Sequence, residues 1–162
     1  MPAVGDARMH YCPKSLAVAS LIALAACNTM QDKTGDEKGP SASLAGTSWR
    51  LVALESSDDK IGVVRPDDPA KYELTFGSDG RVAARLDCNR GSAAYSLATT
   101  DKEKGAINLG PMVMTRAMCP AGSLDTRVGR ELGFVHSYLL HGDRLTLVMM
   151  ADGGNQVWQR KP

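Results

Sequence analysis

Hydrophobic and polar side chains alternate with a period of two in several short segments after residue 44. In the run YELTF at 72–76, every second residue is apolar, which is the pattern of a strand with one buried and one exposed face. Gly- and Asp-rich stretches at 77–80 and 152–155 predict turns between neighbouring strands. We therefore expect strands at residues 49–54, 72–76, 82–86, 91–97, 107–109, 145–149 and 156–160.

The alternation gives way to a helical period at residues 123–140. The apolar residues there lie three or four positions apart, as on one face of a helix: Leu124, Val128, Leu132, Val135 and Leu139. Ser123 is a suitable N-cap residue, and Gly142 stands just beyond the run, where a left-handed residue often ends a helix. We predict one helix at 123–140, although Gly129 and Gly133 each weaken it by about 1 kcal/mol.

Many short strands and one helix indicate the α+β class. We predict a curled, mostly antiparallel, barrel-like β-sheet packed on one main α-helix, all within a domain at residues 44–162. Hydrophobic residues make up 43% of the chain and charged residues 23%, an ordinary globular composition. The net charge is only +1 and no dense basic run is present, so nucleic acid is not an expected partner.

The N-terminus has a different pattern, because an apolar run at 16–26 follows Lys14. A helix of this length rises roughly 16 Å, about half of a bilayer's hydrocarbon core. A short apolar run behind a positive charge is typical of a secretory signal peptide. The run ends in LAAC at 24–27, which resembles the lipobox of bacterial lipoproteins. We therefore expect a lipoprotein signal peptide at 1–26; an ordinary signal peptide or a buried helix is the alternative.

The lipobox resemblance implies that Cys27 becomes the new N-terminus and carries lipid, which would anchor the chain in a membrane. Asn28 follows it and, by resemblance to Gram-negative lipoproteins, favours the periplasmic face of the outer membrane. Residues 27–43 are polar, contain two glycines and a proline, and show no periodicity, as expected for a flexible tether. The predicted localisation is therefore the cell envelope.

The four cysteines divide naturally if the chain is exported. Thiols pair in oxidising compartments; Cys12 would leave with the signal peptide and Cys27 would carry lipid, so Cys88 and Cys119 remain for each other. Such a bridge contributes roughly 3–4 kcal/mol on the chain-entropy model. Two lone cysteines lack the spacing of a zinc site. A redox-active Cys88 beside Arg90 would lack the usual Cys-x-x-Cys motif.

Several segments are similar to the META domain family, the family of HslJ-like heat-shock proteins. They are AGTSWRLV (45–52), CN (88–89) with Tyr95 beyond it, GPMVMTRAMCP (110–120), Glu131 with Phe134 in the predicted helix, and HGDRLTL (141–147). The resemblance spans residues 44–160, and its most specific part is Met-x-x-Thr-Arg-x-x-Cys at 112–119. Ala93 departs from it, because the family often has glycine there. The resemblance implies a small α+β fold and a link to envelope stress or antibiotic tolerance, and it supplies no settled catalytic activity.

Four polar residues beside the expected bridge form a candidate binding patch: Asn89, Arg90, Thr115 and Arg116. The alternative is that the side chains of Asn89 and Thr115 satisfy backbone groups in turns. Three methionines lie in the same segment, Met112, Met114 and Met118. Methionine suits a packed core and also the adaptable wall of a binding groove, and both interpretations stay open.

Residues with catalytic or metal-binding patterns are scarce. His136 and His141 fall on the predicted helix and at its end, where we expect structural roles. The acidic pairs at 58–59 and 67–68 lie in a loop without the spacing of a calcium site. Motifs of serine hydrolases, zinc proteases, phosphate loops and dinucleotide sites do not occur. We therefore expect no enzyme activity, no cofactor and no metal.

These observations together predict a lipid-anchored, non-enzymatic binding or stabilising protein of the envelope, with an envelope protein or ligand as its partner. An envelope hydrolase or a protease inhibitor is the first alternative; a pocket ringed by perturbed carboxylates would favour the enzyme, and an exposed rigid loop the inhibitor. The second alternative is a carrier for a small apolar molecule, which requires a large cavity inside the curled sheet.

Overall fold

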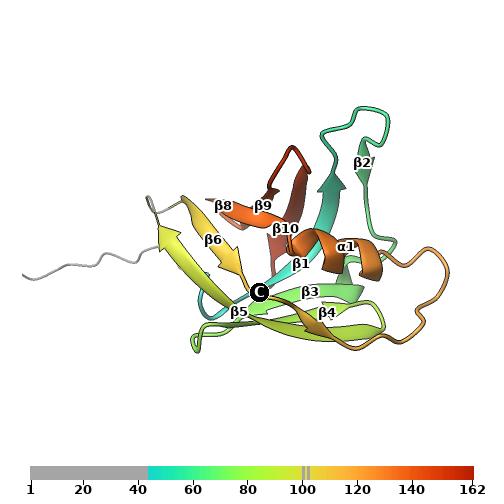
Figure 1. The fold of residues 1–162 in the computed structure, drawn as a ribbon, viewed down its shortest axis with the longest axis horizontal. Coiled ribbons are helices and arrows are strands. Elements are labelled where there is room, and N and C mark those ends of the chain that lie inside the picture. The colour runs from blue at the N-terminus through green and yellow to red at the C-terminus, as the bar shows by residue number, and fades with distance from the viewer. Residues whose placement is uncertain (1–43, 100, 102) are drawn as a thin grey trace, which may run out of the picture. The chain divides into compact units, whose positions relative to one another are not determined.

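The computed structural model describes residues 44–162 apart from 100 and 102 (Figure 1). The predicted signal peptide at 1–26, the lipidation site Cys27 and the tether at 27–43 lie outside the described residues. The elements, in chain order, are β1 (Thr47–Glu55), β2 (Val63–Val64), the 3-10 turn η1 (Pro69–Lys71), β3 (Tyr72–Phe76), β4 (Arg81–Leu86), β5 (Asn89–Thr99), β6 (Lys104–Leu109), β7 (Val113–Met114), α1 (Asp125–Leu132), β8 (Val135–His141), β9 (Arg144–Met149) and β10 (Asn155–Arg160). In this part of the chain no helix is long and apolar enough to cross a bilayer.

The strands close into an antiparallel barrel. Neighbours follow the order β10-β9-β8-β6-β5-β4-β3-β1, and β1 also pairs with β10, which closes the circle. Two short strands extend it: β2 pairs with β1, and β7 pairs with β5 beside β6. The predicted α+β class with a curled, barrel-like sheet and one helix is confirmed. Each predicted strand is present, with ends that differ by up to three residues.

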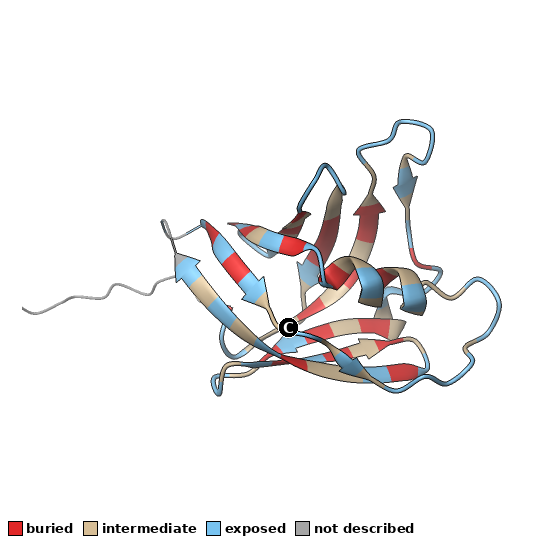
Figure 2. Ribbon diagram, viewed as in Figure 1, coloured by how far each residue is buried: buried red, intermediate tan, exposed pale blue. Residues whose placement is uncertain are grey.

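The alternation of apolar residues places one face of the longer strands, such as β3 and β4, inside the barrel, as the burial colours show in Figure 2. The largest side chains with less than 2% exposure are aromatic: Trp49, Trp158, Tyr72, Tyr138 and Phe76. Burying one such side chain stabilises the fold by roughly 1.5–3 kcal/mol. Because these rings fill the interior, the barrel encloses a packed hydrophobic core.

Charged side chains cover the outer face of the wall made by β10, β1, β3 and β4. Glu73 on β3 accepts from Lys161 at 3.0 Å and lies 3.3 Å from Arg50 Nε and 3.4 Å from an Arg85 nitrogen. Arg50 and Arg85 stand directly opposite Glu73 on the two flanking strands. This register brings three cations to one carboxylate. Ion pairs of Glu73 therefore connect β3 to β1 and β4 on the outer face of the wall.

The predicted helix at 123–140 is too long. Helix α1 ends at Leu132, and residues 135–141 form strand β8. A register shift between Val135 and Ser137 interrupts the alternation of buried residues, so the apolar positions imitate a helical period. Leu139, expected in the helix core, is 48% exposed.

Both ends of the helix differ from the prediction. The N-cap position is Leu124 rather than Ser123, whose Oγ accepts from the Asp125 N–H at 3.3 Å. Gly142 does adopt a left-handed φ of 57°. It lies in the two-residue turn between β8 and β9, where His141 pairs with Arg144, and does not end a helix.

Candidate functional site

The predicted bridge between Cys88 and Cys119 is confirmed, with the Cα atoms 5.5 Å apart. Cys88 occupies the two-residue turn between β4 and β5, because Leu86 and Asn89 are paired. Asp87, the other turn residue, has a φ of 55°, and aspartate tolerates this left-handed conformation better than most residues. The bridge fastens this turn to the segment at 115–124, which leads into α1.

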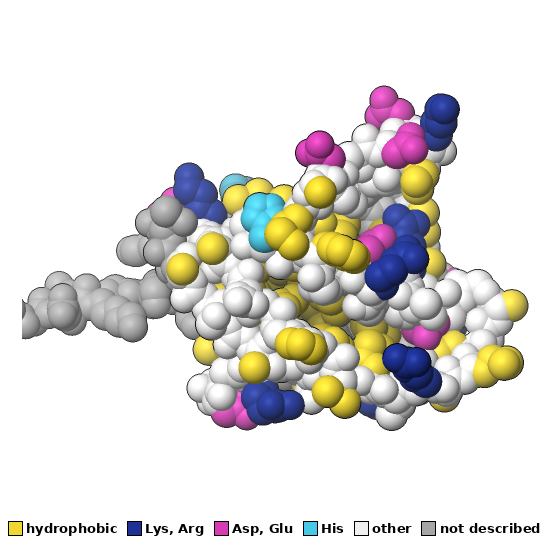
Figure 3. All heavy atoms as spheres, viewed as in Figure 1, with side chains coloured by type: hydrophobic (Ala, Val, Ile, Leu, Met, Phe, Trp, Pro, Cys, Tyr) yellow, Lys and Arg dark blue, Asp and Glu magenta, His cyan; other side chains and the backbone are white. Residues whose placement is uncertain are grey.

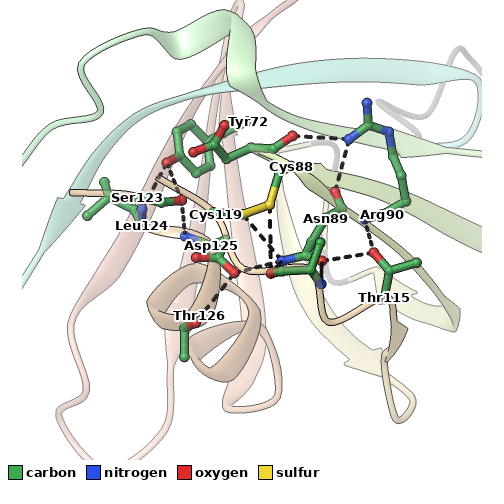
Figure 4. Close-up of a disulfide and its surroundings, with 12 residues drawn as sticks. Tyr72, Cys88, Asn89, Arg90, Thr115, Cys119, Ser123, Leu124, Asp125 and Thr126 are labelled. Atoms are coloured by element: carbon green, nitrogen blue, oxygen red, sulfur yellow. Dashed lines mark hydrogen bonds between the residues drawn. A yellow bond between two sulfur atoms is a disulfide. The ribbon is translucent and has the colours of Figure 1, made fainter. Parts of the chain in front are cut away.

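The buried amide of Asn89 holds the same segment in place (Figure 4). Its Nδ2 group donates to the Ala117 carbonyl at 3.1 Å and to Asp125 Oδ2 at 2.9 Å. Its Oδ1 atom accepts from Ala117 N at 2.8 Å and from Thr115 Oγ1 at 2.9 Å. Asn89 is only 2% exposed, and its hydrogen-bonding capacity is used within the protein.

Two further polar side chains fasten α1 to the barrel. Tyr72 on β3 accepts at its hydroxyl from the Leu124 N–H at 2.8 Å, just before the helix begins (Figure 4). Gln156 on β10 donates to the Val128 carbonyl and to Glu131 Oε2, each at 3.3 Å. The apolar side chains of Val128 and Leu132 are buried in the core. Helix α1 is therefore held at both ends by strands from different parts of the barrel.

An open groove of about 740 Å³ lies between α1 and the segment at 112–118. Met112, Met114 and Met118 line it on the strand side. Met112 and Met114 pack partly against the core, whereas Met118 is 99% exposed. Figure 3 shows hydrophobic side chains in the hollow beside the helix, with Lys or Arg side chains near it. The three methionines thus serve both core and groove, so neither interpretation from the sequence was complete.

Two arginines stand on opposite sides of the groove, Arg116 on the strand side and Arg130 on α1. Both are exposed, and neither side chain has a hydrogen bond or ion pair with the described residues. The groove also contains a carboxylate, Asp125, which is engaged by Asn89. The groove therefore offers apolar sulfur-containing surface and two available guanidinium groups.

The structure brings the four residues of the predicted binding patch together, but their roles differ. Asn89 and Thr115 bond to each other, and Thr115 Oγ1 also accepts from the Arg90 N–H at 2.9 Å. The Arg90 guanidinium donates to the carbonyls of Asp87 and Asn89, each at 3.1 Å. Arg116 alone among the four has no such partner in the described part of the chain. Asn89 and Thr115 therefore form the frame of the site, the hydrogen-bonded contacts that hold the segment at 115–124 against β5. Arg116 faces the groove.

Helix α1 contributes four lining residues that the sequence did not identify: Asp125, Thr126, Gly129 and Arg130. They form a continuous strip along the helix, beside the buried Val128 and Leu132 and turned further toward solvent at Thr126 and Arg130. A prediction that placed the helix ends correctly would have identified these lining residues as one side of the helix. Nothing in the sequence says which element lies opposite that side.

The two histidines lie elsewhere. His136 and His141 are both exposed on β8, not on a helix and at its end as predicted, and neither lines the groove. Among residues 44–162, leaving aside 100 and 102, no three His, Cys, Asp or Glu side chains gather as metal ligands would.

The META domain model matches residues 42–161. The chain belongs to the META domain family. Two solved structures match this chain, and the first of them has a similar fold. The NMR structure of a protein from Burkholderia xenovorans is 21% identical, with a TM-score of 0.57, over 73% of this chain and 83% of that one. A crystal structure of a DUF4847 family protein from Bacteroides vulgatus is 14% identical, with a TM-score of 0.48, over 72% and 93% of the two chains. A search of curated proteins found no match.

The most specific META segment of this chain, residues 112–119, coincides with the groove. It supplies the two residues of β7, the hydroxyl of Thr115 that bonds to Asn89, and the bridged Cys119. Of the other META residues, Glu131 lies in α1 and pairs with Arg127 at 2.7 Å, whereas Phe134 lies just past the helix and not inside it. In this protein the META segment therefore frames one side of the groove.

Proposed function

We propose that the protein is a lipid-anchored, non-enzymatic binding module of the bacterial cell envelope. The observation that carries this proposal is the open groove, lined by methionines and by two exposed arginines without partners among the described residues. Binding sites commonly combine apolar surface with a few polar groups in a cavity of this size. A disulfide and the bonds of Asn89 hold the strand side of the groove in one conformation.

The residues of the groove favour binding over catalysis. The described residues that line it include no histidine or cysteine. The Thr115 hydroxyl and the Asp125 carboxylate, which could act as nucleophile or base, already bond to Asn89. Arginine binds carboxylates and phosphates through paired hydrogen bonds and stays protonated. A ligand that carries an anionic group next to an apolar one is the best match.

Export and anchoring rest on the leader and the lipobox-like LAAC sequence at 24–27. The Cys88–Cys119 bridge is consistent with folding in an oxidising compartment. META membership adds the expectation of a role in envelope stress or antibiotic tolerance.

Intact mass spectrometry of the native protein under non-reducing conditions tests localisation and bridge together. We expect a chain that begins at Cys27, carries acyl groups, and weighs two hydrogen atoms less than the reduced form. A Cys27→Ser variant should remain unlipidated and leave the membrane fraction. Recovery of the native chain from the cell interior with residues 1–26 attached would contradict the proposal.

The groove itself is tested by obstruction. A Thr126→Trp variant fills the groove, and Ser96→Trp adds the same bulk at an exposed site on β5 outside it. Compounds retained from an envelope extract by the native protein should be retained equally by the Ser96 variant and lost by the Thr126 variant. Equal retention by both would place binding elsewhere, and retention of nothing by the native protein would contradict a binding function.

One observation favours a second candidate function, inhibition of an envelope protease. The segment at 115–124 is exposed and is held by the bridge and Asn89, and Met118 stands 99% exposed on it. A rigid loop that presents one side chain is the usual form of a protease-binding loop. Stoichiometric inhibition of an envelope protease that disappears in a Met118→Asp variant would support this alternative.

A further inference from the structure

Within residues 44–162, apart from 100 and 102, the barrel wall is incomplete beside the groove. Strands β6 and β8 pair at only three positions, from Lys104↔Leu139 to Ala106↔Ser137. The second half of β6, residues 107–109, pairs with β5 and has no described strand on its other side. Nearer the start of β5, strand β7 pairs with the same edge that β6 occupies farther along. Strand β7 also lacks a second neighbour among the described strands. A free strand edge therefore runs along this side of the barrel.

The register shows which peptide groups this edge presents. The Thr115 N–H donates to the Arg90 carbonyl at 2.9 Å, and Gly91 stands opposite Met114. In an antiparallel ladder this makes Gly91 and Met114 a pair without mutual hydrogen bonds, so their peptide groups point outward from the pair. The N–H and C=O of Met114 therefore point away from β5.

Helix α1 forms the opposite side of the groove and leaves room for a chain. A Cβ atom added at Gly129 would lie 3.0 Å from Met114 Sδ and 3.4 Å from Leu86 Cδ1. The Met114 side chain thus packs directly against the helix backbone and forms a floor, while Thr126 and Arg130 stand at the wall. A groove between a free strand edge and a helix is a geometry suited to strand addition.

We propose that the groove binds an extended acidic peptide segment, which adds to the edge of β7 as a further strand. Its backbone would bond to the peptide groups of Met114, its carboxylates would bind Arg116 and Arg130, and an apolar side chain would contact the methionines. This inference rests on the proposed binding function and names the class of ligand. The main-chain donor and acceptor at Met114 match a peptide backbone, and the two guanidinium groups match carboxylates.

The probe is a library of random decapeptides, selected against the purified native protein and, in parallel, against an Arg116→Glu/Arg130→Glu variant. An Arg65→Glu variant is the matched control, because Arg65 is an exposed arginine outside the groove. We expect peptides rich in Asp and Glu from the native protein and the control. Each lost arginine should weaken binding of the selected peptide at least tenfold, because a hydrogen bond to a charged group is lost. The double variant should therefore bind it at least a hundredfold more weakly. Thermal unfolding of the variants verifies that they fold.

Alternate N-methylation of the selected peptide tests strand addition directly. Methyl groups on one set of alternate peptide nitrogens should abolish binding, and methyl groups on the other set should leave it unchanged, because only one edge of an added strand faces β7. Slower hydrogen exchange at the Met114 N–H in the complex should accompany binding.

Several outcomes would overturn the inference. They are selection without enrichment of acidic residues, equal tolerance of both methylation patterns, and unchanged affinity in the double variant. If the library yields no peptide while the groove still retains an anionic amphiphile that the Thr126→Trp variant loses, the peptide inference fails and the binding function stands. If neither binds, both fail.

Discussion

Two sides of this barrel are built differently. The wall of β10, β1, β3 and β4 consists of strands paired over four to six positions, with buried aromatic rings on its inner face. The side with the groove consists of the two-residue strand β7, a helix of eight residues and the exposed segment at 115–124. The wall is stabilised mainly by burial, whereas the groove side depends on the bridge, Asn89, Tyr72 and Gln156.

The difference shows how one small domain combines stability with an exposed site. Burial of apolar area is non-directional and needs many neighbours, so it favours a continuous wall. A groove has few neighbours, and directional links can hold its residues in place without filling it. The predictions below separate these two kinds of stabilisation.

The largest effect is expected in the wall. Trp49 is fully buried, and the Arg160 guanidinium stacks over its ring at 4.4 Å. Trp49→Ala should lower the free energy of unfolding by about 3–5 kcal/mol in a urea titration. Val113→Ala, at a groove-side residue that is 76% exposed, is the control and should change it by less than about 0.5 kcal/mol. Equal losses in both variants would contradict the proposed division.

Removal of the bridge should act mainly on the groove side. A Cys88→Ser/Cys119→Ser variant should lose about 3–4 kcal/mol of stability, since the bridge joins residues 31 positions apart. Hydrogen exchange should accelerate in 115–124 and α1 more than in β1 and β10, because the bridge constrains only the former directly. The same increase in all of these segments would show that the two sides open together.

The charged outer face of the wall predicts a smaller effect that depends on pH. Partial burial acts to raise the pKa of Glu73, but hydrogen bonds from Lys161 and Arg50 and the charge of Arg85 outweigh it, so the pKa lies below its ordinary value of 4.5. When folding lowers the pKa of a carboxyl group, the charged group stabilises the protein at any pH above its ordinary pKa. This stabilisation is lost as the pH falls through the pKa of the folded state. Glu73→Gln should therefore cost about 1 kcal/mol at pH 7.

The pH profile identifies the cause of that loss. Unfolding free energies of the native protein and of Glu73→Gln, measured from pH 7 downward, should converge below the ordinary pKa of 4.5. Asp152→Asn changes an exposed acidic residue that has no ion pair among the described residues, and it serves as the control. A difference that stays constant with pH would show that the carboxylate charge is not the origin.

The smallest effect on stability is expected at Met118, whose side chain is 99% exposed. Met118→Ala should change the free energy of unfolding by less than about 0.5 kcal/mol. The same variant should weaken binding of the selected acidic peptide by roughly two- to tenfold, because the ligand loses one apolar contact. A loss of stability without a loss of affinity would assign Met118 to the fold and not to the groove.

The elements of the wall were largely predictable. The alternation in 72–76 is regular because β3 pairs with two strands that are regular beside it. The stretch at 123–140 was not predictable in the same way. The shift between Val135 and Ser137 is a property of the pairing with β9, and it leaves a pattern that a helix would also produce.

The candidate site was predictable in part. Asn89, Thr115 and Arg116 were identified because they flank the two cysteines, and the partnership of Cys88 with Cys119 followed from the cysteine count and the leader. Arg130 was missed, since an exposed arginine on a helix has no feature that distinguishes it. The division between Asn89, which is buried in the frame, and Arg116, which faces the groove, depends on side-chain direction alone.

By itself the sequence determined the strand periods, the α+β class, the META membership and the pairing of two cysteines. Each of these follows from a local pattern of residues or from the composition of the chain. Only the tertiary structure decided that β1 and β10 close the barrel, that the wall is incomplete beside β7, and that α1 lies across from it. These features arise from contacts between residues far apart along the chain. Which strands meet, and where one is missing, is settled by how the whole sheet curls around its aromatic core.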